Sequence, residues 1–203
     1  YLYGLACHRL GNYDAAEMAL LKGQEIAEEK NNLQGLAYIC KGFSILYDDR
    51  GMWGKSIRNI EKALKIQIQL NNNTVEAMLR FDYAGYLNHQ GETDLSIEQN
   101  KQAAKLMIDL EDDRLIGISY AIFNNTYLII GDFTKSLEYG KKSLAIFRKL
   151  GMSSYEAKLL SVLGDAYCRT GNFVKLKEVI DLAKPITKEF NDIFVEAKIN
   201  YQN

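Results

Sequence analysis

The chain has 203 residues, of which 47% are hydrophobic and 25% are charged, with a single proline. This composition is that of a globular protein with ample material for a hydrophobic core. The 25 Lys and Arg residues are balanced by 26 Asp and Glu residues and interspersed with them, which argues against a nucleic-acid-binding surface. No stretch approaches the ~18 uninterrupted apolar residues of a membrane span.

The residue types that carry chemistry are sparse and scattered. Cys7, Cys40 and Cys168 are too few and too far apart for a disulfide framework or a zinc site, and they fit a reducing compartment such as the cytoplasm. His8 and His89 have no partner at metal-ligand spacing. A Gly-rich phosphate loop and a nucleophile elbow are both missing from the sequence. The sequence therefore predicts no enzyme activity, no cofactor and no metal site.

Short breaks divide the chain into evenly spaced segments. In chain order they stand at Gly11, Asn31-Asn32, Gly51, Asn71-Asn72-Asn73, Gly91, Asp112-Asp113, Gly131, Gly151, Gly171 and Asn191-Asp192. Five of the glycines follow one another at steps of 40 residues. Between breaks the apolar period is helical: within 133–150, for example, Leu137, Leu144 and Phe147 are spaced by seven and three residues. We therefore expect pairs of helices of about 16–18 residues, stabilised by stacking on neighbouring pairs.

Single residues within these segments have expected roles. Each of the five glycines suits a left-handed helix C-cap, and Asp132 and Asn172 can accept hydrogen bonds from the first amides of the following helix. We expect Asn124 to form an interhelical hydrogen bond, and Tyr127 and Tyr167 to be buried. Pro185 should kink the last helix or end it early, because proline removes a helical hydrogen bond.

The stretch Leu163-Gly164-x-x-Tyr167-x-x-x-Gly171-Asn172-Phe173 resembles the tetratricopeptide repeat, in its long-helix variant. Small residues also recur where two helices of a pair would touch, at Ala16, Ser56, Ser96 and Ser136, and at Gly23, Ala63, Ala103, Ser143 and Ala183. The resemblance implies an all-α, right-handed superhelical solenoid of about five helix-turn-helix repeats. It would form one domain over residues 1–203, truncated at both ends, with repeat turns at Gly11, Gly51, Gly91, Gly131 and Gly171.

The resemblance also implies that the first helix of each pair lines a concave groove that binds a protein or peptide. Residues at matching distances before each glycine give the candidate groove: Tyr38, Lys41, Ile45, Met78, Phe81, Asp82, Asn88, Ile118, Ile122, Asn125, Ile129 and Arg169. An apolar floor near 118–129 and acidic residues at Asp48, Asp49 and Asp82 suggest a ligand with apolar anchors and a basic end.

Simpler structural roles stay open for several of these residues. Asn125 could be satisfied locally, and Met78 and Phe81 could belong to the core between repeats. His89 and Arg169 could serve the dipole at a helix C-terminus. Asp48 and Asp49 could be solvated.

The leading functional hypothesis is a protein-binding or peptide-binding module, acting as the sensor or docking part of a larger intracellular signalling or transcription-regulatory protein. One alternative is a module for homodimerisation of an attached effector, through Ile118, Ile122 and Ile129 or through the open ends of the solenoid. Another is a regulatory switch in which a peptide closes the superhelix. In all three the partner is a protein or peptide, with no role for nucleic acid or membrane.

Overall fold

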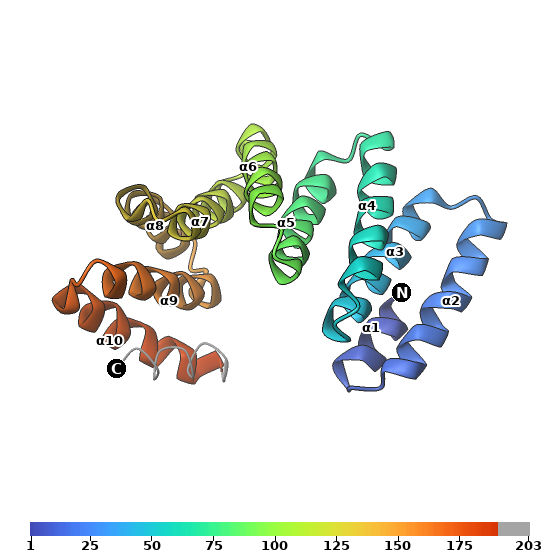
Figure 1. The fold of residues 1–203 in the computed structure, drawn as a ribbon, viewed down its shortest axis with the longest axis horizontal. Coiled ribbons are helices and arrows are strands. Elements are labelled where there is room, and N and C mark those ends of the chain that lie inside the picture. Colours follow the sequence, from blue (N-terminus) through green and yellow to red (C-terminus); the bar gives the residue numbers. More distant parts are fainter. Residues whose placement is uncertain (191–203) are drawn as a thin grey trace. The chain divides into compact units, whose positions relative to one another are not determined.

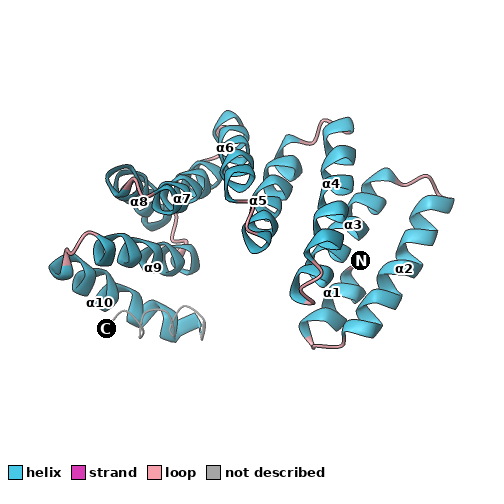
Figure 2. Cartoon of the chain, viewed as in Figure 1, coloured by secondary structure: helices cyan, strands magenta, loops and turns pink. Residues whose placement is uncertain are grey.

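The structure is a computed structural model that describes residues 1–190. Ten α-helices and no strand occupy these residues (Figures 1 and 2). Their bounds are α1 Leu2–Arg9, α2 Tyr13–Glu29, α3 Leu33–Asp49, α4 Trp53–Gln69, α5 Asn73–Gln90, α6 Thr93–Asp109, α7 Asp113–Ile130, α8 Phe133–Lys149, α9 Ser153–Arg169 and α10 Phe173–Phe190. From α2 onward each helix has 17 or 18 residues, as the spacing of the breaks predicts.

The chain divides into two compact units, Tyr1–Leu106 and Met107–Asn203, called unit 1 and unit 2 below. In unit 1 each of the helices α1 to α4 packs on the helix that follows it, and α1 also packs directly on α3. In unit 2 each of the helices α7 to α9 packs on the helix that follows it, and α7 also packs directly on α9. Consecutive helices of similar length that pack in sequence make a helical repeat, so the expected all-α repeat architecture is confirmed.

The turns show why the breaks recur. All five glycines that are 40 residues apart have a positive φ, between 68° and 87°, which is a conformation that glycine adopts without a steric penalty. The side chains of Asp132 and Asn172 then accept hydrogen bonds from the amides of Lys135 and Lys175, each at 3.1 Å. The predicted capping at both turns is confirmed.

The second turn of each pair uses other residues with positive φ, namely Asn31 at 48°, Asn71 at 53°, Glu111 at 54° and Gly151 at 66°. Asparagine tolerates this region better than most non-glycine residues. The predicted break at Asn191-Asp192 lies outside the described residues.

Paired helices approach closely where their side chains are small. Ser56, Ser136 and Ser143 are fully buried, and each hydroxyl donates to a carbonyl oxygen of the partner helix at 2.8 or 2.9 Å. Asn124 donates from Nδ2 to the carbonyl and the hydroxyl of Ser136, at 2.8 and 2.9 Å. The predicted interhelical hydrogen bond of Asn124 is therefore confirmed.

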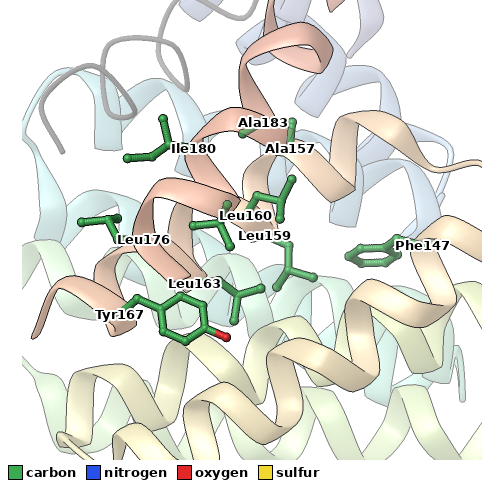
Figure 3. Packing of buried hydrophobic residues seen from close by; sticks show 10 residues of the cluster. Phe147, Ala157, Leu159, Leu160, Leu163, Tyr167, Leu176, Ile180 and Ala183 are labelled. Carbon is green, nitrogen blue, oxygen red and sulfur yellow. The ribbon is translucent and has the colours of Figure 1, made fainter. Parts of the chain in front are cut away.

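Each unit has its own hydrophobic core. In unit 2 one cluster joins α8, α9 and α10 through residues such as Phe147, Leu160 and Ile180 (Figure 3). Unit 1 holds two clusters, one around Leu20 and Phe43 and the other around Ile60, Leu79 and Tyr86. The clusters hold the helices in place and leave one face of α3 and α5 available.

Two predictions about single residues need correction. Tyr167 is buried, with 8% of its surface exposed, but Tyr127 is only partly buried, because its ring lies against Tyr139 near the surface instead of inside a core cluster. The helix α10 continues through Pro185 to Phe190, so the expected early end is not found.

Candidate functional site

The candidate residues of unit 1 lie on α3 and α5. Three large apolar side chains among them are open to solvent: Tyr38 is 39% exposed, Met78 is 41% exposed and Phe81 is 45% exposed. Tyr38 and Met78 are 40 residues apart and take the same position on successive first helices. These exposures argue against the alternative in which Met78 and Phe81 belong to the core between repeats.

An ion pair lies beside these apolar side chains. Lys41 Nζ on α3 is 2.8 Å from Asp82 Oδ2 on α5, and both side chains are largely buried. The ring of Tyr1, which precedes α1, lies 5.5 Å from the ring of Tyr38. Burial raises the pKa of the Tyr1 hydroxyl, which the nearby Lys41 opposes and Asp82 reinforces. Tyr1, Tyr38, Lys41 and Asp82 therefore form one cluster that joins α3, α5 and the residue that precedes α1.

Two histidine–aspartate pairs link the C-terminal ends of the same helices. His8 Nε2 of α1 is 2.7 Å from Asp49 Oδ2, without forming a hydrogen bond. His89 Nδ1 of α5 is hydrogen-bonded to Asp48 Oδ1 at 2.9 Å. Two carboxylates in the last turn of α3 are unfavourable next to the helix dipole. Asp48, whose side chain is 12% exposed, is therefore engaged by His89 rather than simply solvated, whereas the side chain of Asp49 is 47% exposed and stays open to solvent.

The remaining candidates of unit 1, Ile45 and Asn88, are only partly exposed. Beneath this face Tyr86 is buried, and its hydroxyl lies 3.5 Å from Ser44 Oγ. Burial raises the pKa of the Tyr86 hydroxyl, and the carboxylates of Asp82, Asp48 and Asp49 add to this effect.

The candidate residues of unit 2 are less accessible. Ile122 is only 3% exposed, and Ile118 packs against the core cluster of unit 2. Asn125 is partly buried, while Ile129, at 41% exposure, and Arg169 are exposed. The three isoleucines therefore do not form an exposed patch in this structure.

Sequence reasoning missed Tyr1 and His8, although the signal was present. They stand ten and three residues before Gly11, at the same offsets that place Lys41 and Asp48 before Gly51. The repeat offsets therefore extend to the first, incomplete repeat as well.

Hollows on the surface of unit 1 lie elsewhere. A hollow of ≈ 490 Å³ opens between α1 and α2 at Tyr3, Met18 and Ile26. A hollow of ≈ 220 Å³ lies over Cys40, lined also by α2 and α4. Neither is lined by a residue predicted for the groove, so the α3–α5 candidate is a face with protruding side chains rather than one of these hollows.

In the part of the chain that the structure describes, little supports a metal site, a membrane span or a basic surface patch. Residues 1–190 hold no group of three His, Cys, Asp or Glu side chains placed to bind a metal ion. None of the described helices combines the length and the apolar character that crossing a bilayer requires. Four of the five basic residues on α8, namely Lys135, Lys142, Arg148 and Lys149, are each paired with a carboxylate within 3.0 Å, so most of the positive charge of this helix is neutralised locally.

No protein-family model matches the sequence, and no curated protein is similar to it. Solved structures are similar. The apo form of RapI superposes with a TM-score of 0.85 at 20% identity, over 98% of this chain and 73% of that chain. A Rap protein complexed with competence and sporulation factor gives a TM-score of 0.82 at 19% identity, over 98% of this chain and 56% of that one.

A third similar structure is a signal transduction ATPase with numerous domains and a tetratricopeptide repeat sensor, from Pyrococcus horikoshii. Its TM-score is 0.80 at 18% identity, over 96% of this chain and 30% of that chain. At these identities the similarity concerns the fold alone. The chain has the fold of tetratricopeptide-like repeat proteins.

Proposed function

We propose that the chain is a non-enzymatic scaffold that binds a protein or peptide segment on the α3–α5 face of unit 1. The observation that carries this proposal is the exposure of Tyr38, Met78 and Phe81 on successive first helices, beside the paired charges of Lys41 and Asp82. Large apolar side chains gathered on one exposed face are typical of interaction sites. A segment of protein covers such a face better than a small molecule, which needs a concave pocket.

The comparisons support this reading. One similar structure is of a protein complexed with a factor, and another contains a repeat described as a sensor. By analogy, the chain would be the sensor or docking part of a larger regulatory protein. A cytoplasmic setting is supported by the three free cysteines, two of which are buried. The homodimer alternative loses one of its two predicted contacts, the isoleucine patch, because Ile122 is buried.

The test is selection of binders from a displayed library of random peptides of about 12 residues, a length that spans two or three neighbouring helices in extended form. Wild-type protein should enrich peptides that bind the isolated domain in solution. The Met78→Ala/Phe81→Ala double variant should lose them, by about tenfold or more in Kd, as for central interface anchors. Both side chains are exposed, so the variant should keep its helical circular dichroism signal.

Phe173→Ala is the matched control, since Phe173 is also an exposed phenylalanine, 66% exposed, but lies on α10 of unit 2. It should leave the affinity unchanged. Asn125→Ala, measured in parallel, tests whether the partly buried amide of unit 2 contributes to binding. Enriched peptides whose affinity is indifferent to Met78→Ala/Phe81→Ala would refute the assignment of the α3–α5 face.

A further inference from the structure

Two acidic side chains stand next to each other at the end of α3. Asp48 and Asp49 are the last two residues of this helix, where the helix dipole already places partial negative charge. Together with Asp82 of α5, their charges add to the effect of burial in raising the pKa of the Tyr86 hydroxyl. Negative charge is therefore concentrated around the end of α3, where it requires positive partners.

The permanent cations of α3 are engaged by other carboxylates. Lys41, the basic residue within this helix, is paired with Asp82 at 2.8 Å. Arg50, which caps the helix, is paired with Glu17 of α2 at 2.8 Å and lies 3.8 Å from Asp14. The partners of the two terminal carboxylates come instead from the neighbouring first helices, α1 and α5.

One histidine reaches each of these carboxylates. His8 Nε2 on α1 lies 2.7 Å from Asp49 Oδ2. His89 Nδ1 on α5 lies 2.9 Å from Asp48 Oδ1. The sequence contains two histidines, so both are committed to the same turn. The two pairs tie α3 to the first helix before it and to the first helix after it.

A proton on either imidazole strengthens its pair. It converts a contact between a neutral ring and an anion into an ion pair with a charge-assisted hydrogen bond. Each histidine also stands in the last turn of its own helix, where a cation is favourable. One member of each pair stays open to water, since Asp49 is 47% exposed and His89 is 55% exposed, and this limits the cost of removing the charges from solvent.

The other titratable groups around the two pairs do not change charge together with histidine. The ring of Tyr13 on α2 lies 5.6 Å from the ring of His8. Lys55 of α4 lies over the ring of Tyr47 in the last turn of α3. Tyrosine, lysine, arginine and carboxylic side chains ordinarily titrate outside the range from about pH 5.5 to about pH 7.5. Within this range the charge at the end of α3 is controlled by the histidines.

We infer that His8 and His89 form a pH-sensitive clamp, which holds the three first helices of unit 1 together more tightly when both imidazoles are protonated. The added stability is present at mildly acidic pH and is lost as the pH rises through the range in which histidine releases its proton. Unit 2 contains no histidine, so its stability should not follow this change. The clamp acts without a ligand, so its test is separate from that of the proposed function.

Hydrogen exchange of the whole chain at about pH 5.5 and about pH 7.5 tests the clamp, with rates corrected for the intrinsic effect of pH. Protection of the amides of α3 and α5, relative to those of α9, should be about threefold or more higher at the lower pH. The His8→Gln/His89→Gln variant should lose this difference, because glutamine does not titrate. A wild-type ratio that is the same at both pH values, or a variant that keeps the wild-type change, would overturn the inference.

A second variant keeps both histidines and removes their partners. Asp48→Asn/Asp49→Asn conserves the shape of the side chains, but protonated imidazoles then have no carboxylate to pair with. Relative protection of α3 and α5 should stay constant or fall on acidification. If it rises as much as in the wild type, the histidines act without these carboxylates and the clamp does not exist.

The matched control is Glu28→Gln/Glu29→Gln. These residues are also two adjacent carboxylates at the end of a helix of unit 1, but α2 contains no histidine and both side chains are exposed. This variant should keep the wild-type response to pH. Loss of the response here would mean that the total negative charge of unit 1, rather than the two histidine pairs, determines it, and this result would reject the clamp.

Discussion

The helix pairs α3–α4 of unit 1 and α7–α8 of unit 2 are 80 residues apart and show the same local contacts. Phe43 and Tyr47 have ring centroids 5.8 Å apart, and Phe123 and Tyr127 have them 6.3 Å apart. A lysine ammonium lies over the tyrosine in each pair, at 5.1 Å for Lys55 and at 5.2 Å in unit 2. Contacts within a pair are therefore reproduced wherever the same residues stand at the same distance from the turn glycine.

The two pairs differ in what surrounds the tyrosine. The Tyr47 hydroxyl donates to Glu17 Oε1 of α2 at 2.9 Å, and burial together with this bond raises the pKa of Tyr47. The Tyr127 ring instead stacks on Tyr139 of its own pair, at 5.5 Å and an interplanar angle of 5°. In unit 1 the position equivalent to Tyr139 is occupied by Asn59. The repeat position fixes contacts within a pair, while the residues of the neighbouring helices decide burial and exposure.

The same contrast separates the two candidate faces. At the position that holds Tyr38 and Met78, both exposed, unit 2 has Ile118, which packs into its core. Ile118 lies against the core cluster that α8, α9 and α10 form in unit 2, whereas the two clusters of unit 1 include neither Tyr38 nor Met78. Equivalent positions are therefore exposed to solvent in unit 1 and form a packing contact in unit 2.

The largest predicted effect distinguishes two tyrosines at the same repeat position. Tyr167→Ala should lower the free energy of unfolding by about 3–5 kcal/mol, because the ring belongs to the core of unit 2 and is 8% exposed. Tyr127→Ala should cost about half as much, since that ring is only partly buried. Urea denaturation followed by circular dichroism measures both.

Equal losses for the two substitutions would mean that position in the repeat, rather than the local neighbours, sets burial. Hydrogen exchange adds a second check. Contacts in helical repeats join mainly neighbouring elements, so the loss of protection in Tyr167→Ala should concentrate in α9 and α10.

The fold could be predicted from the sequence because its signals are local. A glycine with positive φ, a capping side chain such as Asp132 and a helical apolar period each act within a few residues, and the structure follows all three. The hydrogen bond of Asn124 was also predictable, since its position otherwise holds small residues at a close approach of two helices.

The candidate site could be predicted only in part. The offsets from the glycines place the candidates on the first helix of each pair, but they do not determine whether a side chain is exposed. Ile122 and Asp82 share one offset, yet Ile122 is buried whereas Asp82 forms an ion pair with Lys41. Pairs such as His89 with Asp48 join residues about 40 positions apart, and their formation depends on how neighbouring helices pack.

A smaller loss of stability is expected when the interhelical hydrogen bonds of Asn124 are removed, a position at which the two units carry different residues. Asn124→Ala should destabilise the protein by about 2 kcal/mol, because it removes both hydrogen bonds from Nδ2 to Ser136 and leaves a small void. Asn124→Ser, which introduces the residue that unit 1 has at this position, Ser44, should cost less. Denaturant midpoints measure both variants, and equal stability of the wild type and Asn124→Ala would show that these bonds contribute nothing.

Substitution of Gln67 in unit 1 should instead raise the free energy of unfolding. The Gln67 side chain is fully buried, and neither Nε2 nor Oε1 has a hydrogen-bond partner among the described residues. The equivalent position holds Ala27, Met107 and Phe147 elsewhere in the chain. Gln67→Met conserves the volume and removes two unsatisfied polar atoms, so it should raise the free energy of unfolding by about 1–2 kcal/mol.

The control for this substitution is Gln69→Met on the exposed side of the same helix. It should leave thermal stability unchanged. If Gln67→Met instead lowers the melting temperature, the amide must have a hydrogen-bond partner such as an internal water molecule, and the polar side chain stabilises the fold.

The smallest predicted effect concerns the turn between α6 and α7. Glu111 has a φ of 54°, while the equivalent turn of unit 1 uses Asn31 and Asn71. A side chain without local hydrogen bonding is strained in this region, so Glu111→Gly should stabilise the protein by about 0.5–1 kcal/mol. Glu111→Asn should give part of this gain, and Glu111→Val should lose stability because β-branched side chains fit positive φ least well. Melting temperatures in the order Gly, Asn, Glu, Val would identify backbone conformation as the cause, whereas an order that follows charge or helix propensity would exclude it.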